Sequence, residues 1–256
     1  MNYTEIRPCI ELARIVECYW FLTGDGTVRQ PRRVVPDGRT EIILNSGRPF
    51  AQLTPQGWRV QRKNFFAGQI TGPLWLRPNG PFDLVGIRLT PAGARSLFRN
   101  PLSEMTNQMM PLDMKLSRAT LDHDLTRQII RPPDPRVEAA VVHLIATAGS
   151  ASIDDLAGAV GWSVRHLQRR FLEDVGLSPR VFARMQRFQM VFKAFEETRN
   201  WAQAAIECGY FDQGHLIRDF RELAGAAPTM LSGLAEMFLQ HKSVSHFSRT
   251  GGSRSH

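Results

Sequence analysis

Hydrophobic positions in the second half of the chain recur at helical spacing, and the same pattern occurs twice between residues 152 and 228. Leu167 and Phe171 stand four residues apart in the first copy, and Leu216 and Phe220 stand four apart in the second. Residues at this spacing share one face of a helix. Each copy therefore predicts a helix with one buried stripe and one free face.

A glycine and an alanine mark a turn before each of these helices. Gly161 and Gly209 can adopt the left-handed conformation that ends a helix. Ala157 and Ala205, four residues earlier, leave room for the next helix to cross closely. The copies align at an offset of 49 residues after the turn and 48 before it, so the second copy has one extra residue just after its glycine. Both copies predict helix-turn-helix units.

The segment from Pro179 to Asn200, between the two copies, predicts one long helix. Its apolar side carries Val181, Phe182, Met185, Phe188, Phe192 and Phe195. About 18 residues at roughly 1.5 Å each make a rod about 27 Å long. With one unit packed on each end, this approaches the ~34 Å that separates successive major grooves on one face of B-DNA.

The first half of the chain instead alternates short apolar runs with Gly and Pro, which is typical of β-strands and turns. One strand is expected in the aromatic part of 10–22, and another between the turns Pro36-Asp37-Gly38 and Ser46-Gly47. Further strands are expected over 58–62, 64–68, 74–77 and 82–89, and a helix over 91–99. Such a set of short strands predicts a small barrel or sandwich.

The linker between the halves begins with Met114 to Arg131, where Leu121, Leu125 and Ile129 predict a helix that packs on the N-terminal domain or against a second copy of the chain. The prolines that follow cannot continue a helix. We therefore expect a multidomain α and β protein. Its parts are a β-rich effector domain over 1–113, the helix and Pro-rich linker over 114–135, an all-α domain over 136–240 with two helix-turn-helix units joined by a long helix, and a disordered tail over 241–256.

Composition limits the function classes. At 256 residues with 43% hydrophobic content, the chain suits two modest domains. It has neither the ~18-residue apolar run of a membrane helix nor a signal-peptide pattern, so we expect a cytoplasmic protein that does not bind membranes. Cys9, Cys18 and Cys208 form no CxxC motif and no even set, which fits a reducing compartment.

The net charge of +8 does not come from the all-α domain. Residues 1–134 hold 18 Lys and Arg against 12 Asp and Glu, residues 135–240 hold 11 against 12, and residues 241–256 hold 3 against none. Bulk charge therefore does not indicate nucleic-acid binding, and DNA contact depends on where individual arginines stand. We expect moderate phosphate binding with a modest dependence on salt.

The free faces of the two predicted helices carry residue types that suit a major groove. Arginine pairs with the O6/N7 edge of guanine, and glutamine pairs with the N6/N7 edge of adenine. The candidate DNA-binding residues are Arg165, Gln168 and Arg169 in the first copy, and Gln213, Gly214, Ile217 and Arg218 in the second.

With these residues in place, residues 136–238 resemble the C-terminal DNA-binding domain of the AraC family of transcription regulators. The motifs are G-W-S-V-R-H-L-Q-R-R-F (161–171) and G-Y-F-D-Q-G-H-L-I-R-D-F-R (209–221), followed by G-x-x-P. The resemblance implies that the first residue set enters one groove and the second set the next. Gly214 and Ile217 stand where the family commonly has polar base readers, so looser discrimination is expected from the second unit.

The N-terminal half resembles the β-rich domain that a subset of this family carries. The matching motifs are P-D-G-R-T-E-I-I-L-N-S-G (36–47), G-Q-I-T-G-P (68–73) and G-I-R-L-T-P-A-G-A (86–94). In the wider family such domains bind a small effector or mediate dimerisation. The candidate partners are therefore double-stranded DNA, a small-molecule effector, RNA polymerase and a second copy of the chain.

Candidate chemistry in the N-terminal half points to binding. All seven histidines lie from His123 onward, so this half lacks a His-rich metal centre and the base of a Ser-His-acid triad. We therefore expect that the protein is not an enzyme and that it binds no cofactor and no metal. Converging arginines could bind a carboxylate or phosphate, although a solvated rim is the alternative. The candidate ligand residues are Trp20, Arg29, Arg32, Arg33 and Arg88, while Asp37 and Glu41 are expected to anchor turns or pair with arginines.

The function that we expect is sequence-specific DNA binding by a transcription regulator under effector control. Two alternatives stay open from the sequence. One is a small-molecule sensor or interaction module whose helical repeat binds protein, and the other is an architectural protein that binds DNA without sequence preference.

Overall fold

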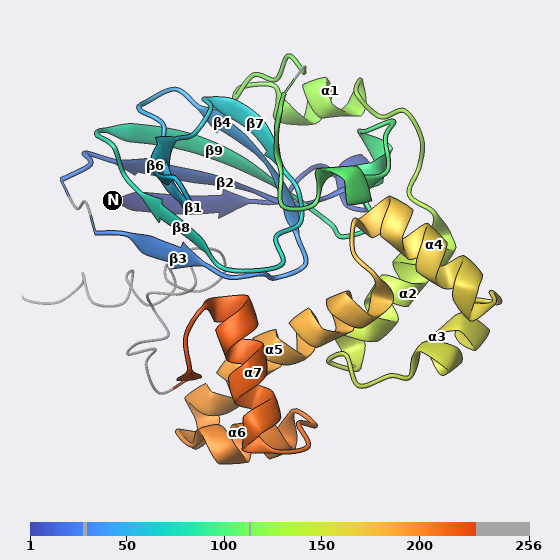
Figure 1. Ribbon diagram of the computed structural model, residues 1–256. Coiled ribbons are helices and arrows are strands. Elements are labelled where there is room, and N and C mark those ends of the chain that lie inside the picture. Colours follow the sequence, from blue (N-terminus) through green and yellow to red (C-terminus); the bar gives the residue numbers. More distant parts are fainter. Residues whose placement is uncertain (28–29, 113, 229–256) are drawn as a thin grey trace, which may run out of the picture.

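The structure is a computed structural model that describes residues 1–27, 30–112 and 114–228. Figure 1 shows a β-rich half and a helical half in contact. The strands are β1 Asn2–Ile6, β2 Val16–Gly24, β3 Arg32–Val34, β4 Thr40–Asn45, β5 Ala51–Thr54, β6 Gly57–Val60, β7 Asn64–Ala67, β8 Leu74–Arg77, β9 Phe82–Leu89 and β10 Met109–Pro111. The helices are η1 Ile10–Leu12, η2 Ala94–Ser96, η3 Leu102–Met105, α1 Leu121–Thr126, α2 Pro135–Ala146, α3 Ile153–Ala159, α4 Val164–Val175, α5 Pro179–Thr198, α6 Trp201–Glu207 and α7 Gln213–Ala224.

The strands form two antiparallel sheets that face each other. The larger sheet has the order β1-β2-β9-β4-β7-β10, and the smaller has the order β3-β8-β5-β6. Successive side chains of a strand point to opposite faces. On β9, Leu84 and Arg88 therefore face the small sheet, while Val85 and Ile87 pack on the opposite side with the short helices. The predicted β-rich, sandwich-like domain is confirmed, with β8 and β9 at their expected bounds.

Two helices expected in this half are shorter than predicted. Only the turn Ala94–Ser96 is helical within 91–99, and only Leu121–Thr126 within 114–131. The Asp124 carboxylate accepts hydrogen bonds from Ser117 N and Thr120 Oγ1, which holds the preceding residues in a turn. Leu121 and Leu125 are buried against the large sheet, so α1 packs on its own domain.

The helical half contains the two predicted helix-turn-helix units, built alike. Ser163 caps α4 by accepting from His166 N, and Asp212 caps α7 by accepting from His215 N, 49 residues further on. Gly176 and Gly225 end these helices in the left-handed conformation, at the same offset. Such caps satisfy backbone groups that a helix end leaves unpaired. The tail over 241–256 lies outside the described residues, as do residues 229–240.

A buried ion cluster lies at the junction of the two halves. The Arg88 side chain is 1% exposed, and its guanidinium bonds Asp37 Oδ2 at 3.1 Å and Glu41 Oε1 at 2.9 Å. Asp37 and Glu41 therefore pair with an arginine as expected, and Asp37 also anchors its turn through Arg39 N at 2.9 Å. Burial raises the pKa of the Glu41 carboxyl, while the Arg88 charge acts in the opposite direction.

Replacing a leucine of the repeated stripe should destabilise the helical half. Leu167 is fully buried, so Leu167→Ala is expected to lower the free energy of unfolding by about 2–5 kcal/mol through lost apolar contact and a residual cavity. Leu172→Ala, in the same helix at a side chain 42% exposed, should cost less than about 1 kcal/mol. Urea unfolding followed by circular dichroism measures both. Equal losses would contradict the assigned core.

Removing the buried guanidinium should make stability depend on pH. Arg88→Met leaves two carboxylates without their cation, which is expected to cost about 3–5 kcal/mol at neutral pH. The native Glu41 pKa, already raised by burial, then rises further, so the folded variant binds more protons than the unfolded chain. Stability should therefore recover as the pH falls towards about 5. Urea titrations at several pH values test this, with Arg62→Met, at an exposed arginine, as the control.

Candidate DNA interface and ligand cavity

The exposed face of α4 carries the three polar residues expected in the first unit. Arg165, Gln168 and Arg169 are exposed, and Arg169 Nη1 lies 3.3 Å from Glu173 Oε1 on the next turn. Such an exposed pair is weak, so a stronger acceptor can displace it. The structure thus leaves three groove-compatible side chains on one free face.

Arg170, next to this face, has a structural role. Its guanidinium bonds Asp134 Oδ2 at 3.1 Å and Asp174 Oδ2 at 2.9 Å, and it also pairs with Glu173. These contacts tie α4 to the residue that caps α2. Helical spacing left Arg170 out of the candidate face, but its partner Asp134 depends on how α4 packs against the start of α2, which the sequence does not show.

The face of α7 is less polar. Gln213, Gly214 and Arg218 are exposed, and Ile217 is half-buried. The opposite side is held by Asp219, which is 2% exposed.

Asp219 binds two elements of the second unit. Its Oδ1 accepts from Arg184 Nε at 2.7 Å, and its Oδ2 accepts from Tyr210 Oη at 3.0 Å. Burial, with Asp219 nearby, raises the pKa of the Tyr210 hydroxyl, so it remains a donor. This buried acid fixes α7 on α5 with its other face outward.

The long helix α5 joins the two units. Its 20 residues span about 30 Å at roughly 1.5 Å per residue. Phe182 and Phe188 are buried in the core shared with Phe171 and Phe220 of the two recognition helices. Figure 1 shows α5 running from the unit of α3 and α4 to the unit of α6 and α7.

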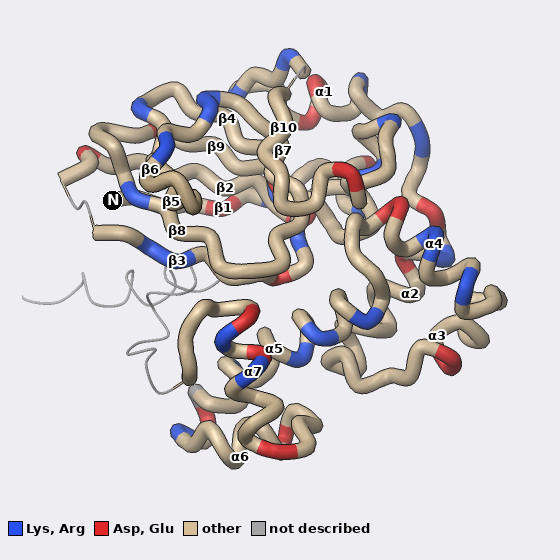
Figure 2. Tube along the Cα trace, in the orientation of Figure 1, with Lys and Arg blue, Asp and Glu red and all other residues tan. Residues whose placement is uncertain are grey.

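Basic side chains are spread over both halves of the molecule. Figure 2 shows Lys and Arg positions along the β-rich half as well as on α4 and α5. This agrees with the near-neutral count for residues 135–240. DNA contact by the helical half would therefore rest on a few placed arginines.

A cavity of about 150 Å³ lies between the two sheets. Of the five candidate ligand residues, Trp20, Arg32 and Arg88 line it. Arg33 does not, because it alternates with Arg32 along β3 and stacks on the Trp75 ring at 4.3 Å. Arg29 lies outside the described residues.

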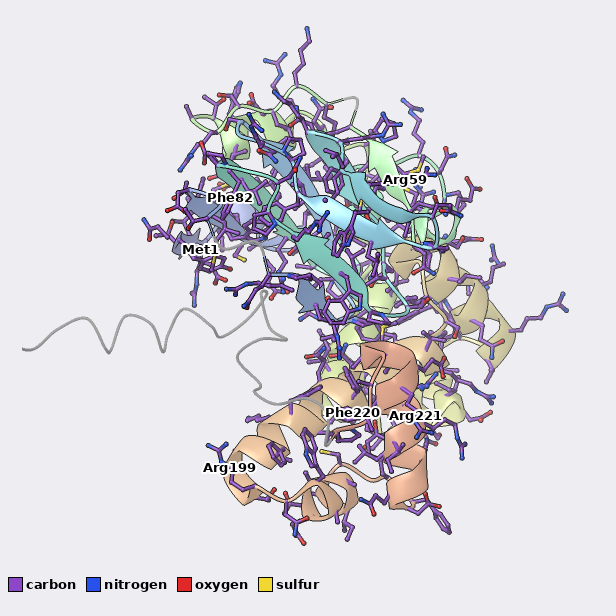
Figure 3. All side chains as sticks on the ribbon, turned by 60° about the vertical axis from the view of Figure 1, so that its left-hand side comes forward. Met1, Arg59, Phe82, Arg199, Phe220 and Arg221 are labelled. Carbon is purple, nitrogen blue, oxygen red and sulfur yellow. The ribbon has the colours of Figure 1, made fainter. Side chains whose placement is uncertain are left out.

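The lining of the cavity is mostly apolar, with a few charged side chains. Apolar side chains from both sheets line most of it, among them Met1 and Phe82, which Figure 3 places on the same side of the β-rich half. The Arg, Lys, Asp and Glu side chains that line it are Arg32, Arg39, Arg62 and Arg88 with Asp37 and Glu41. Arg39 pairs with Glu17 at 2.7 Å, whereas Arg32 and Arg62 have no ion pair within the described ranges.

The sequence did not single out Arg39 and Arg62 as candidates. Arg39 follows the Pro36-Asp37-Gly38 turn, and Arg62 follows β6, so both arrive from loops. Their position beside the cavity depends on how the small sheet closes over the large one. A single sequence does not show that an arginine at the end of a strand lies beside a cavity.

The turn that carries Asp37, one of the residues lining the cavity, adjoins the helical half. Gln189 Nε2 donates to Pro36 O at 2.6 Å, and Gln186 Nε2 approaches Asp37 O at 3.4 Å. A Cβ at Gly38 would lie 2.7 Å from the Phe182 ring, so the turn lies flat on α5. Asp37 therefore holds Arg88 through its side chain and contacts α5 through its carbonyl.

The β-rich half also touches the C-terminal ends of both recognition helices. Thr106 Oγ1 donates to Gly176 O at 2.6 Å, beyond the end of α4. At the end of α7, a Cβ at Gly225 would lie 3.0 Å from Pro73 Cγ. Both left-handed caps thus pack against loops of the first half.

In the part of the chain that the structure describes, no three His, Cys, Asp or Glu side chains gather as a metal site requires. Nor does any helix in these ranges have the length and apolar content needed to cross a bilayer.

Two family matches cover most of the chain. Residues 4–111 match a domain of unknown function (DUF6597), and residues 134–232 match a helix-turn-helix domain. No curated protein sequence matches the chain.

Among solved structures, the chain is similar to ToxT from Vibrio cholerae. A structure in the P21 crystal form has a TM-score of 0.47 at 11% identity, over 83% of this chain and 99% of that one. ToxT bound to an unsaturated fatty acid gives 0.43 at 10% identity, over 83% and 94%. ToxT bound to (E)-4-(8-methylnaphthalen-1-yl)but-3-enoic acid gives 0.46 at 11% identity, over 82% and 97%. By the two family matches, the chain carries an AraC-type helix-turn-helix domain of DNA-binding transcription regulators at residues 134–232, behind a DUF6597 domain at residues 4–111.

Proposed function

We propose that this regulator recognises specific duplex sequences, with α4 and α7 reading successive major grooves. The proposal rests on the pair of exposed faces on α4 and α7. Equivalent N-caps, left-handed C-caps and buried stripes hold both faces outward. Arg165 and Arg169 suit guanine edges, and Gln168 and Gln213 suit adenine edges. The α5 spacer, about 30 Å long, is close to the distance between grooves.

Two other functions could use the same helical repeat. One is binding of a protein partner, and the other is binding of DNA without sequence preference. The near-neutral charge of residues 135–240 disfavours the second, because non-specific affinity comes from neutralised phosphates. A specific reader should prefer its site over unrelated duplex by at least ~10³ at fixed salt.

The cavity between the sheets supports control by a small amphipathic effector. Its apolar walls suit an apolar body, and Arg32 and Arg62 suit an anionic head, since charge-assisted bonds to carboxylate or sulfonate are strong.

The effector acts on the helical half through the Pro36-Asp37-Gly38 turn. An anionic head near Arg88 competes with the Asp37 carboxylate for the same guanidinium. A change at Asp37 moves the two carbonyls that Gln186 and Gln189 hold. Effector binding and the position of α5 are then linked by one turn.

Removal of the first recognition face should strongly weaken site-specific binding. Arg165→Ala/Arg169→Ala is expected to weaken binding to a selected site by roughly 100-fold, since each bidentate base contact is worth about 1–3 kcal/mol. Both side chains are exposed, so the fold should persist. Titration of labelled duplex by fluorescence anisotropy measures the change. Arg59→Ala/Arg99→Ala removes the same charge from exposed positions of the β-rich half and should retain specific binding; equal loss in both variants would reject the proposal.

The turn should transmit cavity occupancy to DNA affinity. Anilinonaphthalene sulfonate, an aromatic anion, is expected to bind the protein and to bind Arg32→Ala/Arg62→Ala roughly tenfold more weakly, because charged hydrogen bonds contribute about 1.5–3 kcal/mol. It should change the DNA affinity of the wild type. Gln186→Ala/Gln189→Ala should still bind the probe but lose this response, whereas Met190→Ala on the same helix should keep it. An unaltered response in the glutamine variant would exclude this route.

A further inference from the structure

The two helix-turn-helix units differ by one residue, and the structure identifies it as Phe211. Before the turn, Trp162 N donates to Ala157 O, and Tyr210 N donates to Ala205 O, both at 2.9 Å, so Tyr210 takes the place of Trp162. After the turn, the N-caps Ser163 and Asp212 correspond. Phe211 therefore has no counterpart in the first unit.

Phe211 is 94% exposed, which is unusual for a phenylalanine. An apolar residue just before an N-cap commonly packs on the fourth helical residue as a hydrophobic staple. Here that residue is Leu216, which is fully buried in the helical core, and Phe211 remains in solvent. The fold of this chain thus makes no use of the Phe211 ring.

Gly214, three residues further on, is also unexplained by the fold. It has no left-handed backbone, and a Cβ there would meet only the Asp212 carboxylate, at 3.2 Å. Glycine within a helix costs about 1 kcal/mol relative to alanine. Within the described part of the protein only this capping carboxylate lies near the position, and the rest of the space around Gly214 is open to an approaching partner.

We infer that the start of α7 forms an apolar thymine-reading surface, made by Phe211, Gly214 and Ile217. The inference rests on the proposed reading of DNA by α7. The C5-methyl of thymine is the apolar group on the major-groove edge, and apolar side chains recognise it by contact. Gly214 lets the helix come close to the bases, and the flanking Gln213 and Arg218 supply the polar contacts.

The two units therefore recognise different chemical groups on the DNA bases. The first unit, with Arg165, Gln168 and Arg169, selects guanine and adenine edges by hydrogen bonds. The second unit selects thymine methyl groups in its half-site, together with the bases that Gln213 and Arg218 contact. The apolar residues of α7 then give discrimination of their own, where the family resemblance alone implied weaker discrimination.

Deoxyuridine substitution tests this surface, because it removes only the methyl group. Sites are first selected with the full-length protein from a randomised duplex pool, and each half-site is assigned by its response to Arg165→Ala/Arg169→Ala. Replacing thymine by deoxyuridine in the α7 half-site should weaken wild-type binding about fourfold per contacted methyl, the equivalent of one buried CH₂. The same exchange in the α4 half-site should have little effect.

Variants of the protein test the same contact from the protein side. Phe211→Ala should weaken binding to thymine-containing sites and make it insensitive to deoxyuridine, while the melting temperature stays unchanged because the ring is exposed. Gly214→Ala should weaken binding, and its melting temperature is measured alongside because the added Cβ lies 3.2 Å from the Asp212 carboxylate that caps α7. Val60→Ala, at another exposed apolar residue in the β-rich half, should change neither.

The outcomes distinguish failure of the thymine-reading surface from failure of sequence-specific binding. Selected sites that bind equally well with thymine and deoxyuridine in the α7 half-site would overturn the thymine-reading surface and leave sequence-specific binding intact. If no sequence is enriched, the proposed function fails and the inference fails with it.

Discussion

The contact between Arg88 and Asp37 fixes both the inside of the β-rich half and its position on the helical half. A guanidinium that is 1% exposed must keep its carboxylates, since loss of either leaves an uncompensated charge. Glu41 meets this need from the neighbouring strand, where its register pairs it with Arg88. Asp37 meets it from the turn that lies on α5. One buried cation therefore links the pairing of two strands, the lining of the cavity and the contact between the two halves.

In the helical half, each helix-turn-helix unit is shaped mainly by its own residues. Each unit buries a leucine and a phenylalanine, caps both ends of its second helix locally, and leaves the remaining face outside. Asp219 and Arg170 fasten these helices to their own units from behind. The recognition faces thus need no contact with the β-rich half to take their shape, which suits the proposed control of their position by that half.

The sequence predicted the elements that local chemistry determines. The left-handed glycines Gly161 and Gly209 and the 49-residue offset could be read from residue types alone, as could strands bounded by Gly and Pro. The length of α1 was overestimated, because the leucine spacing does not show that the Asp124 carboxylate holds the residues before the helix in a turn. Of the candidate ligand residues, Trp20, Arg32 and Arg88 line the cavity, whereas Arg33 points to the other face of β3 and stacks on Trp75. Arg39, Arg62 and the contacts of Gln186 and Gln189 depend on packing between distant segments, for which one sequence offers no pattern.

The loops that touch Gly176 and Gly225 brace the two recognition helices a second time, independently of α5. A span held by two separate supports resists stretching and bending more than a single rod does. A duplex whose helical repeat departs from that span must overwind, unwind or curve to engage both helices, and the energy of this distortion varies with base sequence. Base pairs between the two half-sites, which no side chain reaches, would then influence affinity through their stiffness.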